Sequence, residues 1–376
     1  FTGATAVTFG GAAATAFTVD SATQITATAP AHALATVDVV VTIPGASATG
    51  TAAFLYGRVT TFAGGSGAFL NDVGTAARFN TPRGAALDNA GNLYVADQLN
   101  HRIRKVVLAT GDVTTLAGST AGYLDATGTA AQFNEPYGVA LDGNGNLYVA
   151  DYWNNRIRKV VIATGAVTSL AGNNVVGAVD DTGTAASFWG PRGVACDATG
   201  NVYVCDSGNH RIRKVTPLGV VTTLAGSTNG FADDTGTAAK FFFPQGLAVD
   251  AAGTVFVADS GNQKIRKVTP TGAVTTLAGS SPSGLVEGTG AGAKFFNPCG
   301  LTLDATGTVY VTDTSNHRIR MVTAAGVVTT LAGSVGGTLD GARLGAKFLY
   351  PSGIVYDGIG AFYVVDVGNH RIRKIQ

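Results

Sequence analysis

The chain has 376 residues, of which 45% are hydrophobic and 13% are charged, and its formal net charge is +1. This composition supports a packed core and argues against disorder, and the near-neutral charge argues against recruitment of nucleic acid or an anionic membrane surface. No apolar run approaches the roughly 18 residues of a membrane span, so no membrane insertion is expected.

The first 57 residues are expected to form a unit of their own. Five segments alternate apolar and polar residues at strand period, and Gly, Pro, Ser and Ala separate them. The predicted strands are VTFGG (7–11), TAFTV (15–19), TQITATAP (23–30), TVDVVVTI (36–43) and TAAFLY (51–56).

The string FTGATAVTFGGAAATAFTVDSATQITATAP resembles the immunoglobulin-like IPT/TIG family, which is common in bacterial surface proteins. The resemblance implies a β-sandwich with two further strands before this point, so residues 1–57 are interpreted as a partial Ig-like domain with an open edge. Two explanations stay open: the chain begins inside the domain, or another chain supplies the missing strands by β-augmentation.

Residues 58–376 contain an internal repeat. A motif F-x-x-P-x-G-hydrophobic recurs at spacings of 53 to 55 residues, and its phenylalanines are Phe79, Phe133, Phe188, Phe241, Phe295 and Phe348. The second copy continues with GVALD (138–142), the turn sequence DGNGN (142–146), LYVAD (147–151), RIRKV (156–160) and VTSLAG (167–172). Four short strands in each of six units predict an all-β, six-bladed β-propeller with four-stranded blades.

The number of strands predicts how the ring closes. A VTTLAG-type strand precedes the first F-x-x-P motif, and none follows the last repeat. We therefore expect residues 58–64 to become the outer strand of the sixth blade beside residues 371–375, which removes an exposed edge.

The pattern PxGVAxD…GNxYVADxxNHRIRKV resembles the NHL-repeat family of β-propellers in all six copies. The resemblance implies a six-bladed propeller that members use in unrelated ways: some bind proteins, some bind RNA on a basic face, and a few are lyases with metal sites. The fold alone therefore does not determine the function.

The repeated string D-x-x-N-[HNQ]-[RK]-I-R resembles a catalytic or metal site, but its repetition favours a structural role. His101, His210, His317 and His370 share their position with Asn155 and Gln263, and ligands spread around a ring are too far apart to hold one ion. We expect carboxylate–cation pairs that close the loop between the second and third strands. The predicted pairs are Asp97–Arg102, Asp151–Arg156, Asp206–Arg211, Asp259–Lys264, Asp313–Arg318 and Asp366–Arg371.

The basic residues do not form a nucleic-acid patch in this interpretation. The six [RK]-I-R-[KM] strings contain 17 of the 25 lysines and arginines, evenly spaced and each near an aspartate. A phosphate-binding surface is expected to be clustered instead, so no nucleic-acid partner is predicted.

Two further features concern chemistry. Each loop of about 15–20 residues between a fourth strand and the next first strand contains Asp, Gly and Thr, which favours a packed, turn-rich loop over a Ca²⁺ site.

Three cysteines cannot form a disulfide framework. Cys196 and Cys205 replace small apolar residues of other copies and are expected to be buried, whereas Cys299 occupies a variable loop position and is a candidate for exposure.

Departures from the repeat are the better indication of a binding site. The residue between Pro and Gly is Arg83, Tyr137, Arg192, Gln245, Cys299 or Ser352, and the dipeptide after the repeated aspartate is unusual in the first two blades. One sector of one propeller face is predicted to be aromatic and basic, and to suit a sugar, peptide or protein partner. Its residues are Arg83, Tyr137, Tyr152, Trp153, Trp189 and Arg192. The alternative for Trp189 is that it fills a gap between blades.

The leading functional hypothesis is a non-catalytic, extracellular or cell-surface structural or adhesive protein of bacteria, without a cofactor or metal. A sharper form has the open Ig-like unit completed by another subunit in a head-to-tail fibre. The runner-up is a propeller that binds a glycan or peptide in the aromatic and basic sector. The third hypothesis, a metal-dependent lyase, needs histidines that converge near the axis, and the pattern offers none.

Overall fold

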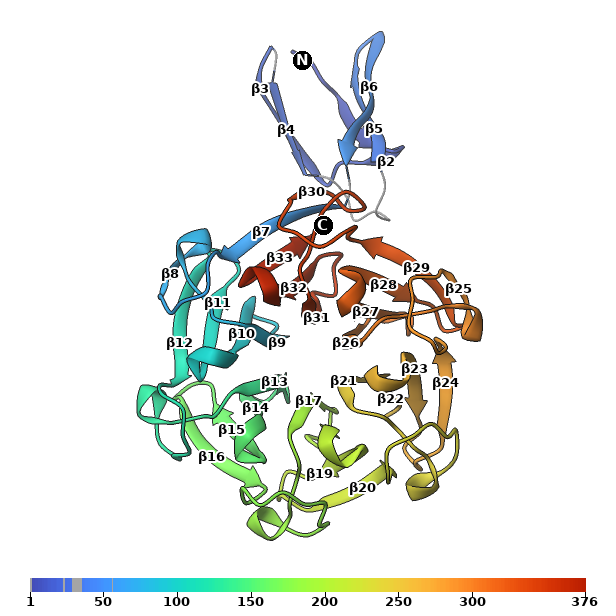
Figure 1. Cartoon of the computed structure of the whole chain (residues 1–376). Helices are drawn as coiled ribbons and strands as arrows, with labels where there is room; N and C mark the ends of the chain where they lie inside the picture. Colours follow the sequence, from blue (N-terminus) through green and yellow to red (C-terminus); the bar gives the residue numbers. More distant parts are fainter. Residues whose placement is uncertain (1, 23, 29–35, 56) are drawn as a thin grey trace.

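The computed structural model describes residues 2–22, 24–28, 36–55 and 57–376, which form a small N-terminal β unit and a closed ring of six sheets (Figure 1). In the described residues the only helical elements are short 3₁₀ turns, and no helix has the length and hydropathy to cross a membrane.

The N-terminal unit contains two small sheets. One has the strand order β2-β1-β5-β6, and the other is the hairpin β3-β4. The strands are β1 (Ala6–Phe9), β2 (Ala12–Ala13), β3 (Ala16–Ser21), β4 (Gln24–Thr28), β5 (Thr36–Ile43) and β6 (Ala46–Leu55). Val7 and Phe9 are buried, and Phe17 and Ile25 of the hairpin pack against them. The five predicted strands are thus present, while residues 23, 29–30 and 56 of the predicted segments lie outside the described residues.

Each blade has four antiparallel strands, and their order in the chain is their order from the axis to the rim, as the repeat predicts. The first three blades are β9 (Pro82–Leu87), β10 (Asn92–Asp97), β11 (Arg102–Val107), β12 (Asp112–Gly118); β13 (Pro136–Leu141), β14 (Asn146–Asp151), β15 (Arg156–Val161), β16 (Ala166–Ala171); and β17 (Pro191–Cys196), β18 (Val202–Asp206), β19 (Arg211–Val215), β20 (Val221–Gly226). The others are β21 (Pro244–Val249), β22 (Val255–Asp259), β23 (Lys264–Val268), β24 (Val274–Ala278); β26 (Pro298–Leu303), β27 (Val309–Asp313), β28 (Arg318–Val322), β29 (Val327–Ala332); and β31 (Pro351–Tyr356), β32 (Phe362–Asp366), β33 (Arg371–Ile375) with β7 (Arg58–Gly64).

Ring closure occurs as predicted. Strand β7 pairs antiparallel with β33, with Val59 opposite Ile375 and Gly64 opposite Arg371, and so completes the sixth blade (Figure 1). Three blades gain a fifth, two-residue strand from a long loop, which the sequence did not predict. These are β8 (Asp72–Val73), β25 (Gly288–Thr289) and β30 (Gly341–Ala342), and they cover the rim edges of β12, β29 and β7.

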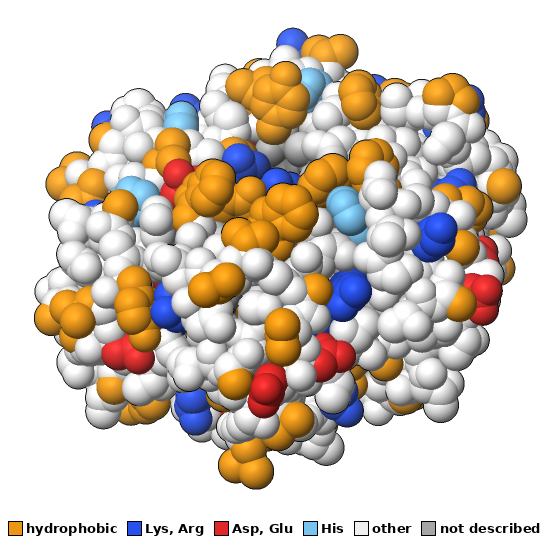
Figure 2. Space-filling view, turned by 60° about the horizontal axis from the view of Figure 1, so that its bottom comes forward, with side chains coloured by type: hydrophobic (Ala, Val, Ile, Leu, Met, Phe, Trp, Pro, Cys, Tyr) orange, Lys and Arg blue, Asp and Glu red, His pale blue; other side chains and the backbone are white. Residues whose placement is uncertain are grey.

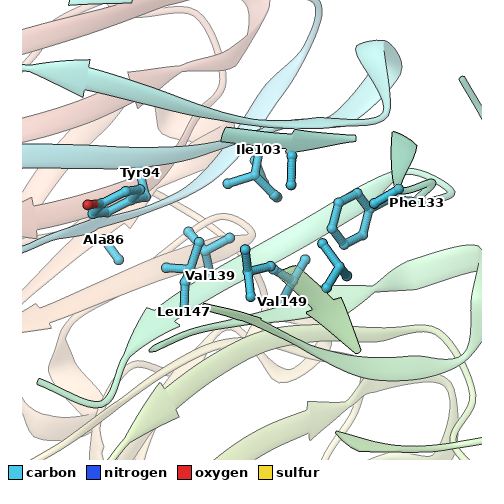
Figure 3. Packing of buried hydrophobic residues seen from close by; sticks show 12 residues of the cluster. Ala86, Tyr94, Ile103, Phe133, Val139, Leu147 and Val149 are labelled. Carbon is cyan, nitrogen blue, oxygen red and sulfur yellow. The ribbon is translucent and has the colours of Figure 1, made fainter. Parts of the chain in front are cut away.

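The hydrophobic core consists of layers between neighbouring blades. Between the first two blades, Tyr94 and Ile103 of one blade meet Phe133, Val139 and Val149 of the other (Figure 3). The phenylalanine of every repeat motif is fully buried in such a layer, which explains its regular recurrence.

Candidate binding face

A 3₁₀ turn joins the second and third strands of every blade, and all six turns lie at the end of the ring where the first strands begin, because Pro82 pairs with Asp97 and each blade repeats this register. We call this end the turn face. The turns are η2 (Gln98–Asn100), η4 (Tyr152–Asn154), η6 (Ser207–Asn209), η8 (Ser260–Asn262), η10 (Thr314–Asn316) and η11 (Val367–Asn369).

The predicted aspartate pairs are wrong by two residues, because each aspartate pairs with the arginine seven residues later and not with the cation five residues later. Asp97 forms its ion pair with Arg104 at 2.7 Å, not with Arg102, and both paired side chains are fully buried. The other pairs repeat this spacing of seven residues: Asp151–Arg158, Asp206–Arg213, Asp259–Arg266, Asp313–Arg320 and Asp366–Arg373. The physical reason is that a long arginine side chain reaches its diagonal cross-strand neighbour, while Arg102 turns away and lies over the ring of Phe69.

Each buried aspartate fixes the chain around it. Asp97 also accepts hydrogen bonds from the backbone N–H of Asn80 at 2.7 Å and from Asn100 Nδ2 at 2.8 Å. Most of the buried arginines bind a second carboxylate in the long loop, as Arg158 does with Asp125. These ion pairs attach the long loops to the blades. Among the described residues no group of three or more His, Cys, Asp or Glu could hold a metal ion.

The histidine position joins neighbouring blades. His101 Nδ1 accepts a hydrogen bond from the backbone N–H of Glu135 in the next blade at 3.2 Å, and His370 does the same for Thr81 at 3.0 Å, across the point of ring closure. Asn155 and Gln263 accept the equivalent bonds through their amide oxygens. Burial lowers the pKa of His101, His210, His317 and His370, which favours the neutral ring that this bond requires.

The variable residues between Pro and Gly converge at the axis. Arg83, Tyr137, Gln245, Cys299 and Ser352 line a cavity of about 60 Å³ on the turn face. The following glycines permit this convergence: a Cβ on Gly353 would lie 2.5 Å from the carbonyl oxygen of Arg83, and a Cβ on each of the other five glycines would lie 2.0–2.6 Å from a neighbouring carbonyl oxygen.

Polar contacts join the axial residues. Tyr137 donates to Gln245 Oε1 at 2.9 Å, and Cys299 Sγ lies 3.4 Å from Ser352 Oγ. Cys299 is 4% exposed, so the suggestion of an exposed thiol is wrong: its loop position lies at the beginning of β26, where the six first strands crowd together. Cys205 is buried as predicted, whereas Cys196 is only partly buried. Burial raises the pKa of Tyr137 to about 12, so this phenol stays neutral.

Five of the six predicted sector residues form one connected cluster, which we call the Arg–aromatic cluster. The guanidinium carbons of Arg83 and Arg192 lie 5.3 and 5.4 Å from the ring centroid of Tyr137. Arg192 also lies over Tyr152, whose ring stacks edge-to-face on Trp153 at 5.0 Å. Arg83 donates to Gln98 at 2.7 Å, while Arg192 Nε is buried without a hydrogen-bond partner among the described residues.

Trp189 lies apart from this cluster. A Cβ on Gly208 would lie 2.5 Å from its indole, so Trp189 packs over the η6 turn of its own blade. It is still 51% exposed. In the fourth and sixth blades, Phe242 and Leu349 pack in the same way over Gly261 and Gly368.

The sequence interpretation missed further exposed apolar side chains on the turn face. In the first two blades the large side chain lies on the 3₁₀ turn, as in Leu99 and Trp153, and in the other blades it precedes the proline. An alignment of the repeats therefore does not show these side chains at one common position. The additional residues, each 43–50% exposed, are Leu99, Phe243, Phe296 and Tyr350. Figure 2 shows hydrophobic side chains beside histidines and basic atoms in the upper part of that view.

Comparison with known proteins agrees with this architecture. The model for the NHL repeat matches residues 79–106, 133–160, 188–215, 241–268, 297–320 and 348–375. NHL repeat-containing protein 2 of Gallus gallus is 30% identical over 78% of this chain and 46% of its own length. Protein SUPPRESSOR OF QUENCHING 1 of Arabidopsis thaliana is 32% identical over 65% of this chain and 25% of its own length. The chain thus spans between a quarter and about half of these relatives.

Solved structures share the fold. An auxiliary nutrient binding protein from Bacteroides ovatus superposes with a TM-score of 0.67 at 21% identity, over 99% of this chain and 90% of that one. A streptogramin B lyase superposes with a TM-score of 0.53 at 12% identity, over 85% of this chain and 98% of that one. At these identities the similarity concerns the fold alone. The six matched repeats and the closed ring of sheets show that this chain is an NHL-repeat β-propeller.

Proposed function

We propose that the protein is a non-catalytic binding propeller that captures a glycan or a peptide on its turn face. The observation that carries this proposal is the Arg–aromatic cluster, where two guanidinium groups flank Tyr137 and an exposed indole lies at the outer edge. The Bacteroides ovatus neighbour described as nutrient binding supports a binding role for the fold, although its ligand is not carried over to this chain.

The chemistry of the cluster defines the ligand. Trp153 is 56% exposed, so its indole offers a flat apolar surface to a sugar ring or an apolar peptide side chain. Arg192 is only partly buried, so its guanidinium offers charge-assisted hydrogen bonds to a carboxylate. We therefore expect a ligand that carries a carboxylate next to a ring or an apolar group.

A surface location and an adhesive role belong to the same proposal. The resemblance of residues 1–57 to an Ig-like surface domain supports them, and we propose that the hairpin β3-β4 accepts a strand from another copy. The described part of the hairpin β3-β4 pairs with no third strand, so a donated strand has an edge to join. Sizing and electron microscopy of native material test this: fibres or oligomers support strand donation, and a monodisperse monomer contradicts it.

The binding proposal is tested with glycan and peptide arrays. Trp153→Ala and Arg192→Gln are each expected to weaken the best wild-type signal by about tenfold or more, which corresponds to about 1.4 kcal/mol. Phe296→Ala is the matched control, because Phe296 is an exposed aromatic on the same face in the opposite blade. Equal binding by the wild type and both cluster variants would contradict the proposal.

A further inference from the structure

A second basic site lies at the junction of the sixth and first blades. Thr61, Ser66, Arg78, Asp340 and Arg371 line a pocket of about 590 Å³, together with Thr75 and the backbone of Gly64 and Gly65. This pocket lies beside the closing strand β7 and shares no lining residue with the axial cavity.

Arg371 differs from the five cations at the same repeat position. In the other blades this cation donates to a backbone carbonyl; the bonds are those of Arg102, Arg156, Arg211, Lys264 and Arg318. Arg371 makes no such bond to a described residue.

The aromatic ring that three other blades place over this cation is also missing. Phe69, Tyr123 and Phe231 lie over the corresponding cations of the first, second and fourth blades at 4.1, 3.8 and 4.6 Å. The sixth blade has the exposed Thr338 at that repeat position. The guanidinium of Arg371 is therefore left open toward the pocket.

A separate departure from the repeat brings a second guanidinium to the same place. Four blades have a serine after the outer strand, and Ser119 for example donates to the carbonyl of Ala131. Here Gly65 stands instead, and Nη1 of Arg78 takes over that contact with the equivalent Ala77 and also binds the carbonyls of Thr75 and Ala76. Nη1 thereby anchors Arg78 with its guanidinium against the pocket.

The carboxylate in the pocket wall does not cancel this charge. Asp340 binds the fully buried Arg373 at 2.5 Å and accepts from the backbone N–H of Thr61 at 2.9 Å. Arg373 in turn pairs with Asp366. Of these five charged groups three are cationic and two anionic, so one positive charge is left without a protein counter-ion.

We propose that this pocket binds a tetrahedral oxyanion, either a free phosphate or sulfate or the same group as an ester on a small molecule. Two guanidiniums with free N–H groups match the geometry of such an anion, and the hydroxyls of Thr75 and Ser66 add neutral donors at the wall.

The test is calorimetric titration of the intact chain with inorganic phosphate and, separately, inorganic sulfate at low ionic strength. Saturable binding of one anion is expected, and glucose 6-phosphate against glucose distinguishes an ester from the free ion. Arg78→Ser uses the residue of the third blade, Ser187, and Thr338→Phe restores the aromatic cover of other blades. Each is expected to weaken anion binding by about tenfold or more.

Lys240→Ser is the matched control, because Lys240 holds the position of Arg78 in the fourth blade, where Phe231 covers Lys264. It is expected to bind like the wild type. The absence of saturable binding at tens of millimolar anion would overturn the proposal, as would unchanged binding in both Arg78→Ser and Thr338→Phe.

Discussion

At the scale of single residues, the molecule depends on buried charges that the repeat places six times. The six paired arginines are among the largest fully buried side chains, and each reaches an aspartate that also anchors the 3₁₀ turn. A buried cation is tolerated only when it keeps its counter-ion, since desolvation otherwise costs several kcal/mol. These arginines are therefore scaffold and are not available to a ligand.

The blades differ in how well they can survive loss of that aspartate. Arg104 has Asp97 as its carboxylate and the neutral Asn71 as its second partner, whereas Arg213 has both Asp206 and Asp180. Asp97→Asn is expected to lower the free energy of unfolding by about 3–5 kcal/mol, because Arg104 then lacks a carboxylate partner. Asp206→Asn is expected to cost clearly less. Urea denaturation measures both, and equal losses would contradict this ordering.

At the scale of elements, the blades are held together by apolar layers and by one hydrogen bond per junction from the histidine position. The donors of these bonds have left-handed backbone, as at Glu135 with φ of 53°, so the bond fixes a strained turn beside the next first strand. Four junctions use a histidine that must stay neutral, and two use an amide.

This arrangement predicts acid sensitivity. The folded pKa of the four histidines lies below the ordinary value of about 6.5, so the unfolded chain binds more protons between the two values. Their contribution to stability is complete above about pH 6.5 and is lost as the pH falls through the lowered folded pKa. The variant H101N/H210N/H317N/H370N is expected to lose much of the decline in Tm over this range, because asparagine accepts the same bond at Asn155. Scanning calorimetry at several pH values measures this, and an identical pH profile of the wild type and the variant would exclude the histidines as its cause.

How much the sequence predicts depends on whether a property repeats. The Phe79-type motif recurs six times, so the blades and the closing strand at residues 58–64 are predicted correctly. The aspartate partner is mispredicted because Arg102 and Arg104 lie on the same face of their strand, and spacing alone does not tell whether the directly opposite or the diagonal arginine pairs with Asp97. Cys299 is misplaced because its burial comes from the convergence of six strands, which no local pattern contains. The exposed apolar side chains of Leu99, Phe243, Phe296 and Tyr350 are missed because they occupy different repeat positions.

At the scale of the whole molecule, the ring is closed by a strand from the opposite end of the chain. Val59 and Ala63 of β7 are fully buried in the last two apolar layers, and β7 covers the edge of β33. The closing strand therefore decides whether the first and last blades stay together.

Removal of this strand is expected to open the ring. Residues 58–376 are expected to unfold in one cooperative transition, whereas residues 65–376 are expected to show a lower Tm and self-association through the exposed β33 edge. A synthetic peptide of residues 58–64 should restore the Tm by adding the missing strand. Calorimetry and light scattering measure these properties, and an unchanged monomeric 65–376 protein would contradict a role of β7 in closure.

The ring has a cavity at each axial end, and either cavity is a possible ligand site. Opposite the turn face, a cavity of about 320 Å³ is lined by the first strands, with Cys196 and Tyr356 at its wall. Its larger volume suits a ligand better than the axial cavity of about 60 Å³, but the guanidinium groups and exposed aromatic side chains of the cluster lie at the turn face.

The binding proposal is tested most directly by the structure of the chain with the best ligand from the arrays. The ligand is expected on the turn face, with its carboxylate against Arg192 and its ring or apolar group on Trp153. A ligand in the opposite cavity, or one bound without contact to Arg192, Tyr152 and Trp153, would contradict the proposal.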